Sequence, residues 1–222
     1  MRAERPKPPR GRQREAGRND ERLLRAARQV FADFGWDAPV SLIARRAGIG
    51  MGSLYRRYGS KEDLVRRIQL VAMARLTEVA EEAGARVDPW EAFVEFMRRA
   101  LRPDNDGGML SIVGGRLAAT PEIDAAAERL RVAVDALVQR AQAAGALRED
   151  VGAGDVMLSL DHLNARLPAP TERVEQLHRR YVDLLLDGLR APAARPLSGP
   201  APSWTELKSM WHAGPTEDDD AG

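Results

Sequence analysis

Apolar residues recur every three or four positions along most of the chain, and this spacing predicts an all-α protein. The first such stretch extends from about Asn19, a candidate N-cap, to Gly35, a residue suited to end a helix. Its apolar stripe consists of Leu23, Ala27, Phe31 and Phe34. We expect Trp36, in the loop that follows, to join the core.

Two short helices joined by a tight turn are predicted over residues 40–58. The core face of the first helix, over 40–47, consists of Val40, Ile43, Ala44 and Ala47. Gly48 can adopt the positive φ of a sharp turn, and a second helix over 51–58 directs Leu54 and Tyr58 to the core. Its opposite face carries Met51, Gly52, Ser53, Tyr55, Arg56 and Arg57. This arrangement is typical of a helix-turn-helix, whose second helix enters the DNA major groove, although an ordinary helical hairpin has the same spacing.

Helical signals continue through the rest of the chain. A capping-box pattern at Ser60 predicts a long helix to about Ala83, whose N-terminus can also hold a phosphate. An N-cap residue followed by proline, a typical helix start, occurs at Asp88 and at Thr120. After a break at 102–108, further helices are predicted over 109–119, from 121 to about 145, over 155–166 and over 171–189. The last of them carries a broad apolar stripe of Val174, Leu177, Tyr181, Leu184 and Leu185.

Both ends of the chain differ from this helical body. Residues 1–18 are rich in Arg, Pro and Gly and should be disordered alone, either as an arm that reaches DNA phosphates or the minor groove, or as a solvated tail. Residues 191–222 form a C-terminal extension with a Pro- and Ala-rich linker, a short capped helix over 203–211 and an acidic tail. The apolar face of that short helix consists of Trp204, Leu207 and Trp211.

Charge is distributed unequally along the 222 residues. The formal net charge is +1, but residues 1–70 hold 17 Lys and Arg against 8 Asp and Glu, whereas residues 71–222 hold 17 against 25. A basic front part on an acidic body is expected when one end of a protein meets a polyanion. The chain has no cysteine, no apolar run of about 18 residues and no secretory-signal pattern, which favours a cytoplasmic protein without a membrane span.

Residues 19–70 resemble the N-terminal domain of TetR-family transcriptional regulators, and their sequence is similar to that of an actinobacterial-type branch. The resemblance rests on four elements in the right order: the LxxAxxxFxxxG first helix, the IAxxAGI second helix and turn, the SLYRRY recognition helix and the SKEDL start of a fourth helix. Beyond residue 70 it is one of helix pattern and length. It implies a helix-turn-helix DNA-binding domain over 19–59 and a helical ligand-binding and dimerisation domain over 60–190.

The resemblance also assigns expected DNA contacts to matching positions. The residues that would approach base edges are Ser41, Met51 and Gly52. The residues that would hold phosphates, or guanine in the case of the arginines, are Ser53, Tyr55, Arg56, Arg57 and Lys61. This chain departs from the common family pattern at Gly50 and Met51, where Ser and Lys are frequent. We therefore expect base readout to rely on apolar contact, for instance with a thymine methyl group.

A ligand-controlled repressor that binds a palindromic operator as a homodimer is the function that the resemblance implies. Candidate residues for a largely apolar effector pocket, with one arginine as a handle for an anion, are Met73, Phe93, Met97, Met109, Ile112, Val113 and Arg116. The apolar members would serve equally as plain core, and Arg116 would serve equally as an ion-pair partner. Dimerisation is expected through helices of about 155–166 and 171–189, with two heads about 34–36 Å apart.

The sequence gives no support for catalysis. Its histidines, His162, His178 and His212, lie far apart and none has metal-ligand spacing. No nucleophile elbow, phosphate-binding loop or zinc-protease motif is present. We therefore expect no enzyme, no metal and no cofactor. The competing hypothesis is a small-molecule binding or scaffold protein in which the helix-turn-helix is only architectural, and the unequal charge argues against it.

Overall fold

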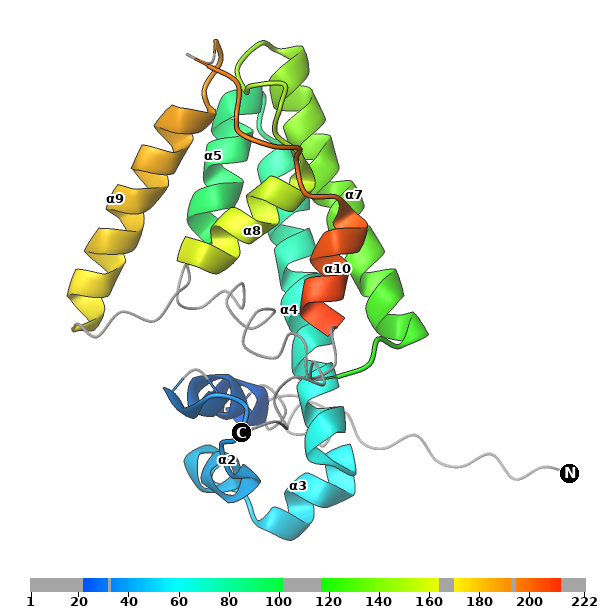
Figure 1. The fold of residues 1–222 in the computed structure, drawn as a ribbon. Helices are drawn as coiled ribbons and strands as arrows, with labels where there is room; N and C mark the ends of the chain where they lie inside the picture. The colour runs from blue at the N-terminus through cyan, green and yellow to red at the C-terminus, as the bar shows by residue number, and fades with distance from the viewer. Residues whose placement is uncertain (1–21, 32, 102–116, 164–169, 193–194, 213–222) are drawn as a thin grey trace, which may run out of the picture. The chain divides into compact units, whose positions relative to one another are not determined.

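The computed structural model describes residues 22–31, 33–101, 117–163, 170–192 and 195–212 (Figure 1). Within these residues every regular element is an α-helix, apart from an isolated antiparallel β-bridge between Leu147 and Arg190. The chain divides into two compact units, Met1–Leu64 and Val65–Gly222, called unit 1 and unit 2 below. The predicted all-α fold is confirmed.

Unit 1 contains a first helix (residues 22–31 and 33–34), α2 (Val40–Ala47), α3 (Met51–Tyr58) and the first turn of α4 (Lys61–Gly84). Apolar side chains from all of these elements form one core. Its members with no more than 1% exposure include Leu23, Ala27, Val30, Phe31, Ile43, Leu54 and Leu64. The predicted bounds of α2 and α3, about 40–47 and about 51–58, are confirmed.

Gly48 makes the turn between α2 and α3 with a φ of 68°. Its N–H and the N–H of Ile49 donate to carbonyl oxygens in the last turn of α2, the latter to Ala44 at 3.0 Å. A side chain at this φ is strained, so glycine allows the chain to reverse at once and α3 to begin three residues later. The orientation of α3 therefore depends on this turn.

The predicted apolar stripe of the first helix is wrong at its end, because Phe34 is 59% exposed. The helix stops at Gly35, which has a φ of 70°, and the chain turns away from the helix axis there. The ring of Trp36, from the following loop, stacks on Phe31 with centroids 6.5 Å apart. Trp36 is half-buried and takes the place beside Phe31 that the periodicity assigns to Phe34.

The described elements of unit 2 are the rest of α4, α5 (Pro89–Ala100), α7 (Pro121–Ala143), α8 (Ala153–Leu163), α9 (Thr171–Leu189) and α10 (Trp204–His212). Both predicted starts with an N-cap and proline are confirmed. The Asp88 carboxylate accepts the Glu91 N–H at 2.9 Å, and the Thr120 hydroxyl accepts the Ile123 N–H at 3.3 Å. Helix α5 packs against α7 and α9, and α8 packs against α7 and α9 (Figure 1).

Two helices predicted in unit 2 differ from the structure in their bounds. Residues 102–116 lie outside the described residues, and the described remainder of the helix predicted over 109–119 is not helical. Thr120 has the extended backbone that a following proline favours, so the chain is already straight before α7 begins. Helix α8 begins two residues earlier than predicted, where the Asp155 carboxylate accepts the Gly152 N–H at 2.8 Å. Its predicted end near 166 lies outside the described residues.

The C-terminal helix α10 packs against α8 and is also paired with α7. Leu207 and Trp211 are 0% and 2% exposed. The indole N–H of Trp211 donates to the Asp161 carboxylate on α8 at 3.3 Å, and Lys208 pairs with Asp124 on α7 at 2.9 Å. The short helix predicted over 203–211 is therefore present and docked.

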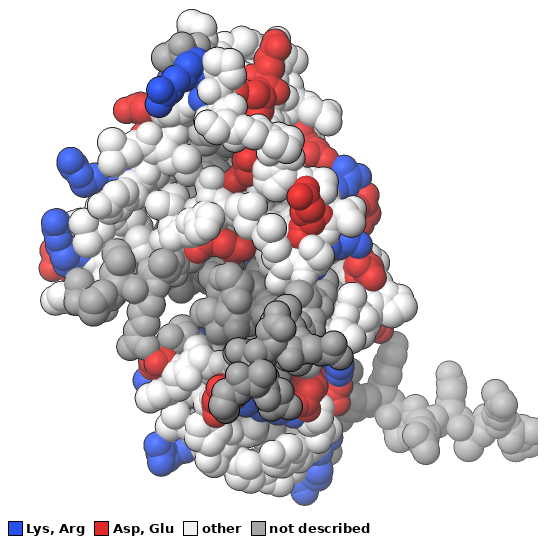
Figure 2. All heavy atoms as spheres, viewed as in Figure 1, with Lys and Arg blue, Asp and Glu red and all other residues white. Residues whose placement is uncertain are grey.

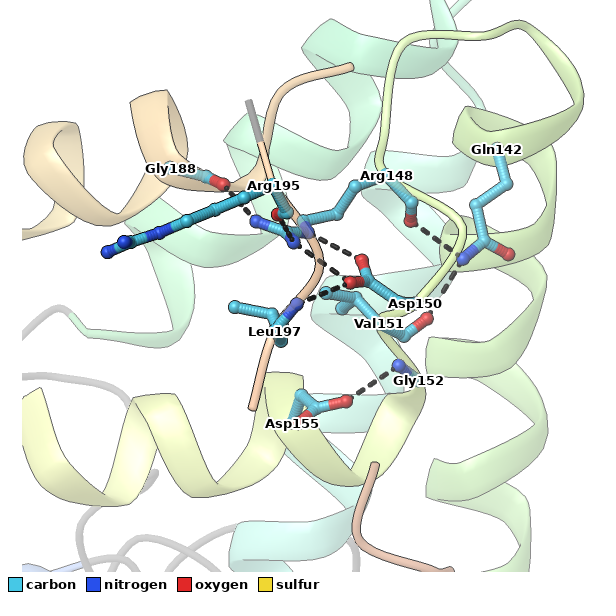
Figure 3. Close-up of polar contacts among 9 residues, drawn as sticks. All are labelled: Gln142, Arg148, Asp150, Val151, Gly152, Asp155, Gly188, Arg195 and Leu197. Atoms are coloured by element: carbon cyan, nitrogen blue, oxygen red, sulfur yellow. Dashed lines mark hydrogen bonds and ion pairs between the residues drawn. The ribbon is translucent and has the colours of Figure 1, made fainter. Parts of the chain in front are cut away.

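A polar cluster around Arg148 and Asp150, called the latch below, fastens the segment before α10 to the body (Figure 3). The Arg148 side chain is 8% exposed, and its guanidinium donates to both carboxylate oxygens of Asp150 at 2.5 and 2.9 Å. It also donates to the carbonyls of Gly188 at 3.1 Å and Arg195 at 2.9 Å. Asp150 accepts the Leu197 N–H at 2.9 Å, and the hydrogen bonds from Arg148 and Leu197 hold the pKa of Asp150 well below its usual range.

Candidate nucleic-acid interface

Helix α3 directs one residue to the core and presents most of the others to solvent. Leu54 is 0% exposed, whereas Met51 and Tyr55 are 37% and 44% exposed. Also exposed are Gly52, Ser53, Arg56 and Arg57. The predicted division of this helix into a buried and a presented face is confirmed, with Tyr58 half-buried at its end.

The start of α3 is bare. Its N-cap, Gly50, has no side chain to accept from the first turn, so N–H groups at this end remain available to an acceptor outside the chain. A Cβ added at Gly50 or Gly52 would meet no atom within 4 Å. Packing within the protein therefore does not require glycine at either position, and the effect of both glycines is a flat, accessible helix start.

The remaining predicted contacts on α2 and α3 are exposed polar groups. Ser41 stands exposed in the first turn of α2. One turn apart on α3, Arg56 donates to the Ser53 hydroxyl at 3.1 Å, so these two side chains are already paired in the free protein. Arg45 is also exposed on α2. It is not among the predicted contacts, although its spacing of four residues from Ser41 places it on the same side of the helix.

The Lys61 side chain is more enclosed than we would expect for a fully exposed phosphate-binding residue. Its Nζ donates to the carbonyl oxygen of Trp36 at 2.5 Å and lies 5.1 Å from the Trp36 ring centroid. The side chain is half-buried, and Glu62 and Asp63 add negative charge to the same first turn of α4. The Ser60 hydroxyl accepts the Asp63 N–H at 3.0 Å, which confirms the predicted N-cap.

The exposed groups of α2 and α3 suit a polyanionic partner that also offers apolar groups for contact. The charged residues of α2 and α3 are all arginines. In the lower part of Figure 2 blue side chains stand on largely uncharged surface. Guanidinium groups, hydroxyls and free helix N–H groups are the donors that bind phosphate oxygens. Met51 adds an exposed apolar contact at the start of α3.

The candidate effector pocket in unit 2 is only partly described. Met73 on α4 and Phe93 and Met97 on α5 are no more than 1% exposed and belong to the core. Met109, Ile112, Val113 and Arg116 lie outside the described residues. The pocket and its arginine handle stay predictions.

Helix α9 presents part of its predicted apolar stripe to solvent. Tyr181 and Leu184 are 50% and 56% exposed, although Val182, Leu186 and Leu189 of the same helix are buried. Val174, Leu177 and Leu185 are half-buried.

In the described part of the chain no three His, Cys, Asp or Glu side chains gather where they could hold a metal ion. None of the helices in that part combines the length and apolarity needed to cross a membrane.

Comparison with protein families matches two segments that together cover most of the chain. Residues 23–68 match the family described as "Bacterial regulatory proteins, tetR family". Residues 88–191 match "Transcriptional regulator SbtR-like, C-terminal domain". Helix α10 and the segment that leads to it lie beyond the second match.

Solved structures extend the similarity over both units. The TetR transcription regulatory protein of Mycobacterium vanbaalenii is 30% identical, with a TM-score of 0.57 over 81% of this chain and 99% of that one. A TetR transcriptional regulator of Streptomyces coelicolor is 30% identical, with a TM-score of 0.54 over 78% of this chain and 99% of that one. The uncharacterized HTH-type transcriptional regulator YhgD of Bacillus subtilis is 32% identical over 80 residues, and the match spans 40% of its length.

Proposed function

The chain belongs to the TetR family of bacterial transcriptional regulators, and from this premise we propose that it is a repressor that binds operator DNA in the cytoplasm as a homodimer and leaves it when a small molecule binds unit 2. The observation that carries the proposal is the presented face of α3. This helix buries only Leu54 and exposes arginines, a tyrosine and a bare N-terminus.

In this proposal the residues divide between reading and positioning. Ser41, Met51 and Gly52 approach base edges, and Met51 supplies an apolar contact of the kind that recognises a thymine methyl group. The phosphate contacts are Ser53, Tyr55, Arg56, Arg57 and Lys61. Phosphate contacts fix the register, and base contacts select the sequence. Lys61 would bind phosphate through the ammonium N–H groups that are not used in its hydrogen bond to Trp36.

The partner proposed for α9 is a second copy of this chain. Tyr181 and Leu184 leave apolar surface in water, and such surface on a helix is stabilised when another helix covers it. Packing of α8 and α9 against the same helices of the second copy would form a four-helix bundle. A dimer also suits the DNA, because two recognition helices reach successive major grooves about 34–36 Å apart.

The proposed effector is small and largely apolar. Met73, Phe93 and Met97 offer adaptable and flat apolar surface from α4 and α5, should a cavity form beside them. Helix α4 is continuous from unit 1 into unit 2, so a change around Met73 can be transmitted along one helix. A few kcal/mol of differential effector affinity between the two states would suffice for release.

The test is selection of duplexes from random DNA by the full-length protein, followed by anisotropy titrations of the selected and a shuffled duplex. We expect enrichment of an inverted repeat with half-sites one helical turn apart and affinity that falls with salt. Failure to enrich any sequence, together with equal weak binding of both duplexes, would support the scaffold hypothesis instead.

A further inference from the structure

Two consecutive arginines in the last turn of α2 have different surroundings. Arg46 donates from Nη1 to the Asp33 carboxylate of the first helix at 2.8 Å and forms an ion pair there. Arg45 is also exposed, but it has no hydrogen-bond or ion-pair partner among the described residues. One guanidinium is therefore committed within unit 1, and its neighbour in sequence is available.

The helix geometry places the two side chains on different sides of α2. Successive residues of an α-helix are separated by about 100°, so Arg45 lies about 40° from Ser41 and Arg46 about 140° from it. Ser41 is the α2 residue assigned to DNA in the proposed function. In a helix-turn-helix this helix crosses the DNA backbone while the next helix enters the groove. Arg45 thus shares the side of Ser41, and Arg46 points to the first helix.

A structural role for Arg45 as a cap of α2 is already filled by other groups. A cation in the last turn of a helix often binds its free carbonyl oxygens. Here the N–H groups of Gly48 and Ile49 donate to carbonyls of that turn. The Arg22 guanidinium reaches from the first helix to the Ala47 carbonyl at 3.2 Å. The Arg45 side chain is therefore not needed to end the helix.

We propose that Arg45 binds a phosphate of the DNA strand beside the groove that α3 enters, and so extends the interface beyond the residues named above. The inference rests on the proposed DNA binding. Recruiting Arg45 breaks no bond to another described residue, whereas Arg46 would have to leave Asp33. Because phosphate contacts carry no sequence information, Arg45 strengthens binding to all duplexes alike and positions the head.

The test compares Arg45→Gln, Arg45→Lys and Arg46→Gln with the wild type in anisotropy titrations over a range of salt concentrations. Each lost phosphate contact makes the slope of log affinity against log salt shallower by about 0.9. We expect that change for each protomer in Arg45→Gln, on the selected and the shuffled duplex alike. Arg45→Lys should keep the wild-type slope, and so should Arg46→Gln. Thermal unfolding checks that each variant is folded.

Two results would overturn the inference. Equal slopes for Arg45→Gln and wild type would mean that Arg45 touches no phosphate. Equal changes of the salt slope in Arg45→Gln and Arg46→Gln would mean that the loss of one positive charge explains the effect, whichever side of α2 carries it. A wild type that binds no DNA would overturn the proposed function and this inference together, so the two failures are distinguishable.

Discussion

Replacing Gly52 by alanine should strengthen the fold and weaken DNA binding. Gly52 is the second residue of α3, and an added Cβ meets no atom of the chain within 4 Å. Gly52 is not among the glycines with positive φ, so alanine fits its backbone. Glycine costs a helix about 1 kcal/mol relative to alanine, and somewhat less near its end. We therefore expect Gly52→Ala to raise the free energy of unfolding by about 0.5–1 kcal/mol.

The same methyl group would stand between α3 and the DNA. If the bare helix start lies against the groove, the extra carbon must be accommodated by separation or local strain, at about 1–3 kcal/mol. That cost corresponds to a rise in the dissociation constant of roughly 5- to 150-fold. Stability and affinity would thus change in opposite directions, which a general loss of structure cannot produce.

The measurement pairs urea unfolding with anisotropy titrations of the selected duplex at one salt concentration. Gly84→Ala is the matched control, since Gly84 ends α4 in unit 2 and an added Cβ would make an ordinary 3.7 Å contact with Leu137. This control should leave the dissociation constant unchanged. Wild-type affinity in Gly52→Ala would refute the idea that the bare start of α3 serves close approach to DNA.

Three further predictions concern other residues. Burial raises the pKa of Asp161 to about 6, and the hydrogen bond from Trp211 offsets only part of this rise. The pKa of Asp161 is about 6 in the folded protein, above the ordinary value of about 3.8 expected in the unfolded chain. The protonated carboxyl therefore stabilises the fold fully below about pH 4, and up to about 3 kcal/mol of this stability is lost as the pH rises through 6. Asp161→Asn should therefore be more stable than wild type at pH 7.5 and equal to it near pH 4 in urea titrations at fixed protein concentration, and a pH-independent difference would contradict the burial argument. Leu184→Glu should convert dimers to monomers in sedimentation experiments at micromolar concentration, because it places a charge in the proposed bundle, and an unchanged dimer would exclude α9 from the interface. Met51→Ala should alter the base preferred at one position of each half-site in a selection from random DNA, whereas an identical consensus would remove Met51 from base readout.

The sequence predicts elements well where local chemistry delimits them. Helices α2, α3 and α9 have their predicted bounds, and α7 begins at the predicted Pro121. Each of these boundaries is set by a glycine, a proline or an N-cap within a residue or two. The DNA-contact candidates on α3 follow from the same periodicity, because one buried residue, Leu54, determines which side is presented.

Features that tertiary contacts decide are not predicted by the sequence. Phe34 continues the helical stripe in sequence, but Trp36 fills the place beside Phe31. Lys61 has the pattern of an exposed cation at a helix start, and its bond to Trp36 joins residues 25 positions apart. Neither contact can be predicted from a local sequence pattern. The same holds for Arg148, whose partners include carbonyls 40 and 47 positions away.

The latch has a practical consequence for anyone who shortens or tags this protein. A chain cut at residue 191, where the SbtR-like match ends, would look complete by family comparison. It would deprive Arg148 and Asp150 of the carbonyl of Arg195 and the N–H of Leu197. It would also uncover α8, where the carbonyl oxygen of Pro202 lies so close to Gly154 that a methyl group would sit only 2.2 Å from it. Fusion partners are therefore better attached after α10, and a recombinant fragment ending at 191 should be expected to aggregate through its exposed α8 surface.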